Sequence, residues 1–392
     1  MVYSQAVNIL FVSEVSLPTV SGVASSTDSI TRFMAERGHR VFLVCPKPVL
    51  PYNPPPQKNL EVIYTASLRD PFFVGKPMGV IPLGLFDMKR ILATKKIDVI
   101  HIQEPGALGI MALFLSKLYH VPTVGAMHFS IEQIIRVVPS LFRPFTAPFT
   151  KAYIHLVYPL YTAIMMPTKT VIPSLSSIIG HAEKIHAVSN GVDTALFIPG
   201  SGPAVTVRRR YHMDPDGFYF SYIGRLDSDK NIETILRALP HTNSSIHLIL
   251  AGVGKQVDAL RALADTLRVS DRIVWFGKVE RPAMIDLYHA SDAFVIMSTV
   301  ETQSLVALQA IACGLPLLAA NAGALPELVR EGKNGYLLPS FDAKKLAQKM
   351  TYLSEHRTIL EAMGKASRAL SLIQDRQKVL RDLERLYQSL CR

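Results

Sequence analysis

An acidic side chain and an amide stand eight positions apart at the start of an apolar, alanine-rich stretch, Glu301–Ala319. The preceding loop is expected to turn into a helix at Ser304 and Leu305. A helix N-terminus presents unpaired backbone N–H groups and the positive end of the helix dipole, so it binds anions such as a diphosphate. Glu301 can accept hydrogen bonds from sugar hydroxyls, and Gln309, about two turns into the helix, can reach a ribose. The layout suits a nucleotide-sugar, although a capped helix behind an incidental acid accounts for the spacing equally well.

Two cations lie in a second candidate loop, GRLDSDKN, at residues 224–231. This loop follows an expected strand and precedes an expected helix. A cation at the C-terminal end of a parallel strand can neutralise a diphosphate, which makes Arg225 and Lys230 candidates for that role. The alternative is a surface loop in which Lys230 pairs with Asp227 and Asp229.

Both segments resemble glycosyltransferase family four, whose members are retaining enzymes with the two-domain GT-B fold. The spacing from Glu301 to Gln309 is similar to the family's Glu-x7-Glu region. The letters ETQ, followed by a small residue and LV, resemble its glycolipid-making and mannosyl-transferring branches, the diacylglycerol glucosyltransferases and phosphatidylinositol mannosyltransferases. Arg225 and Lys230 fall on the two cations of the family's Gly-Arg-x5-Lys element. Gln309 departs from the family's second glutamate, and an uncharged acceptor should bind a ribose hydroxyl less strongly.

The resemblance implies further donor contacts. Gly22 lies after the first expected strand, where the family has a Gly-Gly-Val turn that lets the backbone approach the donor phosphates. His128 ends a strand and resembles a histidine that contacts the donor sugar, the alternative being a buried structural histidine. Val279 closes the segment 276–279, where relatives seat the nucleobase against backbone groups. Residues 190–193 match an Asn-Gly-Val/Ile-Asp turn of the family, or form a structural turn.

The implied reaction is retaining hexosyl transfer. Glu301 would hold sugar hydroxyls, while Arg225 and Lys230 would hold the diphosphate. Backbone groups of Ser304–Val306 would add to the phosphate cradle, with Gln309 on the ribose. Electrostatic stabilisation of the leaving diphosphate would be the main catalytic effect. No Asp-x-Asp motif is present, so we expect no metal and no cofactor beyond the nucleoside-diphosphate sugar. No general base is assigned, because the leaving phosphate can take the acceptor proton.

Composition fits a two-domain enzyme. The chain has 392 residues, of which 49% are hydrophobic and 19% charged. That length exceeds one ordinary core and the composition is globular. Cys45, Cys313 and Cys391 have no metal-like spacing, and their sparse use indicates a reducing compartment. No basic segment followed by an apolar one opens the chain, so we expect a cytoplasmic protein.

A net charge of +11 points to anionic partners. We expect no nucleic acid, because no basic run or nucleic-acid motif occurs. Residues 133–182 contain four basic and no acidic residues, interleaved with aromatics, which is typical of a segment lying in a lipid headgroup layer. Residues 72–85 are a second candidate. A hydrophobic helix packed in the domain explains the pattern equally well. The prediction is peripheral binding to the inner face of the cell membrane and a lipid acceptor; the oligomeric state is open.

The hydrophobic pattern alternates strands and helices twice, which predicts an α/β protein with two doubly wound, Rossmann-like domains; the resemblance implies that they face across a cleft. We expect an acceptor domain over residues 1–199, a nucleotide-sugar domain over 200–374, and a helix over 375–392 that packs back on the first domain. Strands are expected at 7–13, 39–46, 97–103, 122–128, 218–226, 245–252, 272–277, 292–298, 315–320 and 335–339. Helices are expected at 27–37, 109–120, 231–240, 255–267, 281–290 and 306–314.

Four other activities remain open. A soluble sugar acceptor would fit the same donor site. A nucleotide-sugar epimerase would alter the donor without an acceptor, and a non-catalytic binding protein would bind the nucleotide without turnover. A nicotinamide-dependent oxidoreductase is disfavoured, because Gly252-Val253-Gly254 begins a dinucleotide fingerprint whose third glycine is replaced by Val257.

Overall fold

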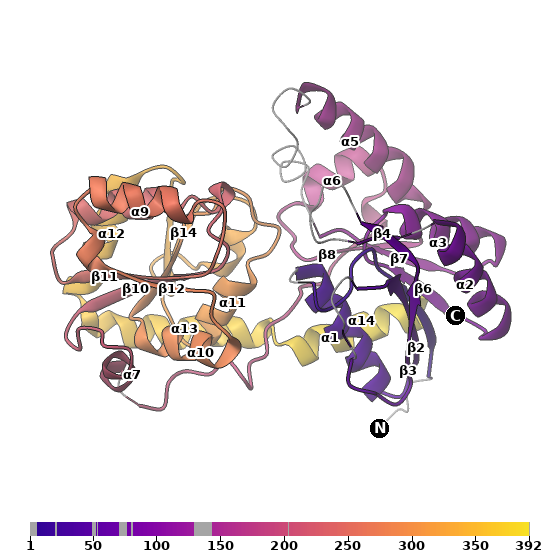
Figure 1. The fold of residues 1–392 in the computed structure, drawn as a ribbon, viewed down its shortest axis with the longest axis horizontal. Coiled ribbons are helices and arrows are strands. Elements are labelled where there is room, and N and C mark those ends of the chain that lie inside the picture. The colour runs from indigo at the N-terminus through magenta and orange to yellow at the C-terminus, as the bar shows by residue number, and fades with distance from the viewer. Residues whose placement is uncertain are drawn as a thin grey trace. The chain divides into compact units, whose positions relative to one another are not determined.

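The computed structural model describes residues 6–19, 22–48, 52, 54–69, 77–79, 81–128, 143–202 and 204–391. In this part of the chain two compact units form, each built on a parallel sheet (Figure 1). The first unit runs up to Ser189 and resumes at Val379, and the second is Asn190–Lys378. The division after Ser189 lies ten residues before the domain boundary expected from the sequence, between 199 and 200.

The first sheet has the strand order β3–β2–β1–β6–β7–β8–β9 among the described residues. Its strands are β1 Asn8–Val12, β2 Arg40–Pro46, β3 Leu60–Thr65, β6 Val99–Ile102, β7 Thr123–Ala126, β8 Ala163–Met166 and β9 Ile185–Ala187. Short apolar stretches such as NILFV form strands that helices cover on both faces, as in other parallel sheets. A short antiparallel pair, β4 Ser67–Arg69 and β5 Pro77–Gly79, lies outside this sheet.

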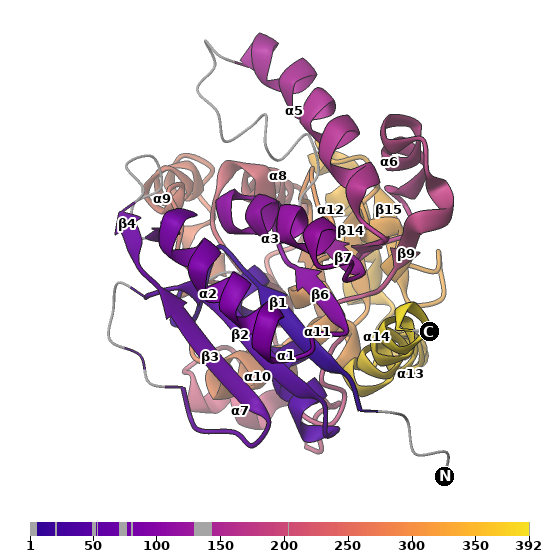
Figure 2. The same cartoon turned by 90° about the vertical axis from the view of Figure 1, so that its right-hand side faces the viewer.

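Helices cover both faces of the first sheet (Figure 2). One face carries α1 Gly22–Glu36 and α14 Arg376–Leu390, and the other carries α2 Ile81–Thr94, α3 Ala107–Leu118, α5 Arg143–Val157 and α6 Ile172–Ile179. Helix α1 begins five residues before the expected start at Thr27. Its first turns are rich in small and hydroxyl residues that look like loop, yet Ala24 and Thr27 are buried there.

The expected membrane segment proves to be partly core. Tyr158 and Tyr161 are buried, and β8 lies between β7 and β9 in the sheet. These tyrosines therefore cannot lie in a headgroup layer, and that part of the prediction is wrong. Arg136 lies outside the described residues, as do residues 72–76 and 80 of the second candidate. Among the helices that the structure describes, none is long and apolar enough to cross a membrane.

The second sheet has the order β12–β11–β10–β13–β14–β15 within the described chain. Its strands are β10 Phe218–Ile223, β11 Ile246–Ala251, β12 Ile273–Gly277, β13 Ala293–Ile296, β14 Leu317–Ala320 and β15 Gly335–Leu338. Figure 1 shows helices on both sides of it. They are α7 Ala204–Arg210, α8 Ile232–Ala238, α9 Val257–Thr266, α10 Arg281–Ala290, α11 Leu305–Ala312, α12 Ala343–Glu355 and α13 Leu360–Ile373.

Helix α14 starts in the second unit and belongs to the first from Val379 on. Its apolar side joins the core that α1 forms with the first sheet. The buried Tyr387 hydroxyl lies 2.6 Å from His101 Nδ1 on β6. The Glu384 carboxylate pairs with His39 Nε2 at 2.9 Å and with Arg37 Nε at 3.2 Å. Apolar burial and these polar contacts together hold α14 on the sheet.

Replacing Tyr387 with Phe should loosen this attachment. The change removes the hydroxyl while keeping the ring, and it leaves a buried imidazole nitrogen without its partner, which costs about 1–3 kcal/mol. Guanidinium unfolding followed by circular dichroism measures the loss. Ser389→Ala removes an exposed hydroxyl from the same helix and serves as the control. Equal stability of the two variants would contradict the role given to this hydrogen bond.

Candidate functional site

The strand order of the second sheet reverses between β10 and β13. Strands β11 and β12 extend it on one side of this pair, and β14 and β15 extend it on the other. Because β10 and β13 are adjacent and parallel, the loops that follow them leave the same edge of the sheet. The carboxyl ends of strands at such a switch point are where open α/β sheets bind ligands. These loops contain Arg225, Lys230 and Glu301.

The charged side chains of the two loops form one network. Lys230 Nζ lies 2.8 Å from Glu301 Oε1 and 3.1 Å from Asp229 Oδ2. The Arg225 guanidinium contacts Asp227 and lies 3.6 Å from the Asp229 carboxylate. The Lys230 and Glu301 side chains are only 12% and 9% exposed, whereas that of Arg225 is 64% exposed. Of the ion pairs weighed as an alternative, Lys230 forms the one with Asp229, while Asp227 pairs with Arg225; Lys230 also pairs with Glu301.

Glycines let the backbone segments around this network approach closely. A Cβ at Gly252 would lie 1.7 Å from the Gly224 carbonyl oxygen, and one at Gly254 would lie 2.2 Å from that of Leu226. The Gly-x-Gly pair after β11 thus serves to pack the Arg225 loop. On the other side, Gly323 has φ +54° and faces the Glu301 backbone, where a Cβ would lie 2.4 Å from the carbonyl oxygen. Nothing in the local sequence around Glu301 identifies Gly323.

The N-terminus of α11 is where the sequence predicts it. Ser304 is the N-cap, and its Oγ accepts a hydrogen bond of 3.3 Å from Ala307 N. Leu305 and Val306 are the first two helical residues, whose N–H groups have no acceptor within a helix. The helix end thus offers two donors and a partial positive charge three residues after Glu301.

Gln309 has a partner that the sequence could not identify. Its Oε1 accepts from the hydroxyl of Tyr288 at 3.2 Å, and that hydroxyl also lies 3.1 Å from the Val306 carbonyl oxygen. Tyr288 is buried on α10. The contact fixes the side chain of Gln309 while leaving it half-buried. Its spacing of 21 residues from Tyr288 gives no local signal.

Two other predicted elements occupy the second unit. Val279 is half-buried in the loop after β12, at the edge where the parallel neighbours β10 and β11 also end. The turn 190–193 is held structurally: Gly191 has φ +69°, and a Cβ there would lie 2.7 Å from the Arg376 Cα. The Asp193 carboxylate pairs with Arg376 as well. This turn thus supports the end of the second unit, in agreement with the alternative that residues 190–193 form a structural turn.

The first unit contains the other two candidates. His128 is half-buried two residues after β7, and its Nε2 lies 2.5 Å from Gln103 Oε1. Burial lowers the pKa of His128 to about 4, so the imidazole is neutral near pH 7 and Nε2 can donate this hydrogen bond. Gln103 is fully buried, and its amide nitrogen has no partner among the described residues. Gly22 is exposed and opens α1, while Ser21 lies outside the described residues.

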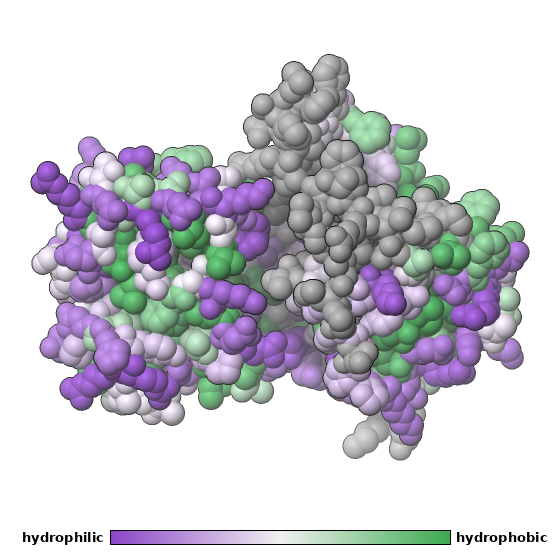
Figure 3. All heavy atoms as spheres, viewed as in Figure 1, coloured by the Kyte–Doolittle hydropathy of each residue, from purple (hydrophilic) through white to green (hydrophobic). Residues whose placement is uncertain are grey.

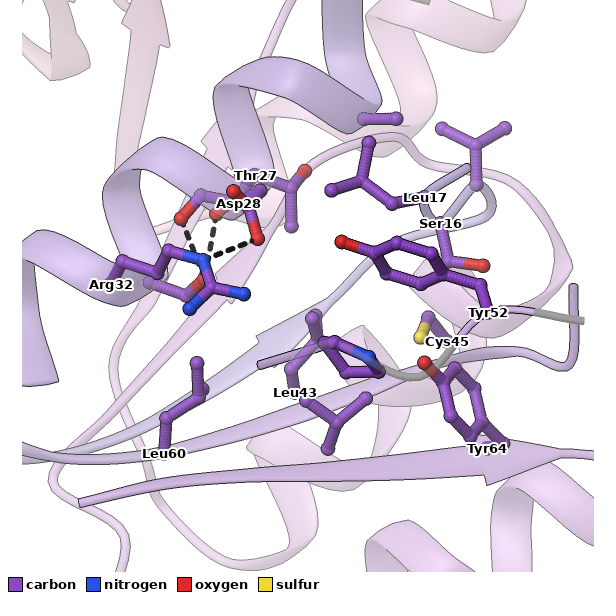
Figure 4. A pocket seen from close by; sticks show the side chains of 15 residues that line it. Ser16, Leu17, Thr27, Asp28, Arg32, Leu43, Cys45, Tyr52, Leu60 and Tyr64 are labelled. Atoms are coloured by element: carbon purple, nitrogen blue, oxygen red, sulfur yellow. Dashed lines mark hydrogen bonds and ion pairs between the residues drawn. The ribbon is translucent and has the colours of Figure 1, made fainter. Parts of the chain in front are cut away.

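A cavity in the first unit is too small for a nucleotide. It lies beside α1, β2 and β3 and has a volume of about 30 Å³, space for about one water. Figure 4 shows the Asp28–Arg32 ion pair at one end and Tyr52, Cys45 and Tyr64 at the other. Burial raises the pKa of the Cys45 thiol to about 12, which makes it unreactive. In the described residues, no group of three His, Cys, Asp or Glu side chains is placed to hold a metal.

Comparisons with known proteins cover most of the chain. Residues 206–370 match the family model "Glycosyl transferases group 1", and residues 20–196 match "Glycosyltransferase Family 4". A GDP-mannose-dependent alpha-mannosyltransferase of Mycobacterium tuberculosis is 26% identical over 85% of this chain and 84% of its own. The alpha-monoglucosyldiacylglycerol synthase of Acholeplasma laidlawii is 24% identical over 90% and 89%. The crystal structure of Anabaena HepE in complex with UDP superposes with a TM-score of 0.78 at 18% identity, covering 97% of this chain and 100% of HepE.

Acid should destabilise the first unit through its buried imidazoles. Burial, and to a lesser degree His128, lowers the pKa of His101 to about 3. Below pH 6.5 His101 therefore takes up a proton in the unfolded chain but stays neutral in the folded chain. The contribution of this histidine to the free energy of unfolding is complete above pH 6.5 and decreases as the pH falls towards 4. Each such histidine adds a slope of up to about 1.4 kcal/mol per pH unit.

Denaturant unfolding between pH 7.5 and pH 5 measures this slope. His101→Gln should reduce this slope by about the contribution of one bound proton. His181→Gln, a change at an exposed histidine, should leave the slope as in the wild type. A His101→Gln variant with the wild-type slope would show that His101 is protonated in the folded chain.

Proposed function

Since the chain belongs to glycosyltransferase family 4, whose members are retaining hexosyltransferases with nucleotide-sugar donors, we propose that it transfers a hexose to the hydroxyl group of a membrane lipid. Its two parallel α/β sheets form the GT-B fold. The observation that supports the donor part of the proposal is the nearly buried Lys230–Glu301 ion pair at the switch point of the second sheet. Glu301 lies three residues before Ser304, the N-cap of α11.

In the proposed donor complex the diphosphate contacts the two cations, Arg225 and Lys230, that pair with carboxylates in this structure. Arg225 is the exposed cation, so its guanidinium can leave Asp227 and Asp229 for a phosphate. Lys230 can touch the diphosphate and remain on Glu301, because an ammonium has three donors. Glu301 keeps its second oxygen for sugar hydroxyls. The backbone N–H groups of Leu305 and Val306 complete the cradle.

Departure of the diphosphate is the step that these groups assist. Negative charge grows on the leaving phosphate as the glycosidic bond breaks, and once the donor is bound the two cations and the helix end can stabilise it. The leaving phosphate can accept the proton of the incoming hydroxyl from the same face. We propose that no metal takes part. Gln309 on the ribose, Val279 by the base, and Gly22 and His128 on the donor stay predictions.

Two observations support a lipid acceptor. One similar protein is named alpha-monoglucosyldiacylglycerol synthase, so an enzyme named for a lipid product is similar in sequence to this chain. The first unit also exposes large apolar side chains on α2, α3 and α5. Exposed apolar surface of this kind marks interaction sites with proteins or membranes. A lipid acceptor would place the protein at a membrane as a peripheral enzyme.

Donor screening followed by product analysis tests the proposal. Thermal shift with UDP-, GDP- and ADP-sugars identifies the donor, because a ligand at about 100 times its dissociation constant adds about 2.7 kcal/mol. Incubation with that donor and diacylglycerol vesicles should yield a glycolipid with retained anomeric configuration. Transfer only to a free sugar would overturn the lipid acceptor, and alteration of the donor without any acceptor would indicate an epimerase.

Removing either cation should slow the reaction. Arg225→Ala and Lys230→Ala should each lower turnover by about 10²-fold or more, since preorganised donors of this kind are worth roughly 3–4 kcal/mol. Arg225→Ala is the cleaner test, because Arg225 is exposed and its loss should leave the melting temperature unchanged. Lys365→Ala, at an exposed lysine paired with Glu361, is the control. Normal turnover in both variants would remove the diphosphate role of this loop.

Restoring the family's acid at position 309 should not harm donor binding. A carboxylate makes a stronger hydrogen bond to a ribose hydroxyl than an amide does, and it can still accept from Tyr288. Gln309→Glu should therefore keep or improve the donor Kd measured by calorimetry. Gln309→Met, which keeps the length but loses the acceptor, should weaken it by about tenfold, as expected for one hydrogen bond. A large loss in the Glu variant instead would mean that the amide N–H donates to the ligand.

A further inference from the structure

An apolar groove in the first unit lies close to two half-buried carboxylates, those of Glu14 and Glu104. It runs along α3 and is lined by residues 105–107, Ile110, Met111, Phe114 and Tyr153, with a volume of about 720 Å³. Volumes of about 300–1,000 Å³ are usual for small-molecule sites. Ile110 and Phe114 are exposed, although both are large apolar side chains on one face of α3. Helix α3 therefore exposes to solvent an apolar face of the kind that usually packs against another element.

Carboxylates lie behind the wall of the groove at Gly106. A Cβ at Gly106 would lie 2.6 Å from the Glu14 carboxylate, so the acid sits directly behind the groove wall. Glu14 Oε1 accepts from Gly109 N at 3.1 Å, and Glu104 Oε2 accepts from Glu14 N at 3.1 Å. Burial raises the pKa of Glu14 against the lowering by its backbone hydrogen bonds. A ligand that fits has an apolar chain and a hydroxyl-bearing end.

The surroundings of the groove favour a lipid over a protein helix or a soluble sugar. Figure 3 shows hydrophobic residues at the surface over α2, α3 and α5. They include Phe86, Leu118, Phe149 and Leu156, which are all more than half exposed. The sequence of α3 contains Lys117 and no acid, and that of α5 likewise has basic residues only. Apolar side chains among cations match the acyl layer and the anionic headgroups of a bilayer.

We propose that the α3 groove is the subsite for an acyl chain of the lipid acceptor, with the hydroxyl end of that lipid directed to the Glu14 side. The inference rests on the proposed lipid acceptor and names the residues that would hold it. The groove narrows the predicted membrane-contacting element to α3 together with the part of the segment 133–182 that α5 occupies. Helix α3 reads in sequence as an ordinary buried helix, and only the exposure of Ile110 and Phe114 reveals the groove.

Lipids with brominated acyl chains test occupancy without any enzymatic activity. Trp275 is the only tryptophan of the chain, so Trp275→Phe provides a silent background. Adding Phe114→Trp places an indole on the groove, and adding Phe341→Trp instead places one at a similarly exposed position of the second unit. Phosphatidylglycerol vesicles with brominated chains should quench the indole at position 114 and leave the one at 341 bright. Equal fluorescence of the two would overturn the proposal.

A chain-length comparison tests the consequence for transfer. The double variant Ile110→Gln, Phe114→Gln should lower kcat/KM for dioleoylglycerol about tenfold or more relative to short-chain dibutyrylglycerol, because each buried methylene contributes about 0.8 kcal/mol. Phe341→Gln should leave the ratio unchanged. Quenching without lipid transfer would reject the lipid acceptor but keep the groove, whereas transfer with an unchanged chain-length ratio would reject the groove alone.

A second copy of the chain is the competing occupant. Sedimentation velocity without lipid separates it from the lipid: the proposal expects the same sedimentation coefficient for the wild type and for Phe114→Gln. A wild-type dimer that the substitution converts to monomers would show that the groove is a subunit interface instead.

Discussion

Lys230 and Glu301 are both almost out of water, and they form an ion pair of 2.8 Å there. Removing one partner from such a pair leaves an uncompensated charge, which costs several kcal/mol when the site is buried. The pair therefore constrains the two loops after β10 and β13 to lie together, 71 residues apart in the chain. A diphosphate arriving beside it meets a lysine already fixed in position. Stability of the loops and readiness for the donor rest on the same contact.

Buried polar partners recur wherever the candidate residues are fixed. The buried Tyr288 contacts Gln309, and the buried Gln103 contacts His128. In each case the functional candidate is half-buried or buried and its partner comes from another element. Such contacts remove rotamer freedom before a ligand binds, so less entropy is lost on binding. Each of these candidates thus has a partner that fixes its side chain.

Sequence patterns identified the candidate ligand-binding residues and missed the residues that contact them. Arg225, Lys230 and Ser304 stand at strand ends or a helix start, which local hydrophobic patterns reveal. Gln103, Tyr288 and Gly323 contribute through contacts across the fold, and no local pattern encodes these. The strand β8 was missed for a related reason: a short apolar stretch with tyrosines has the same composition in a core as at a membrane surface. Which side of α3 meets solvent was equally hidden, because its sequence is apolar all round.

The path of α14 makes the second unit an insertion within the first. The chain leaves the first sheet at Ser189, completes the second unit, and returns only at Val379 to supply Leu383 and Tyr387 to the first core. During synthesis, domains ordinarily fold in the order in which they emerge. Here the second unit has all its residues before the first does. The ribosome must therefore synthesise the whole second unit before the first sheet gains α14, so a chain that stalls before Val379 would carry a finished second unit on an unfinished first unit.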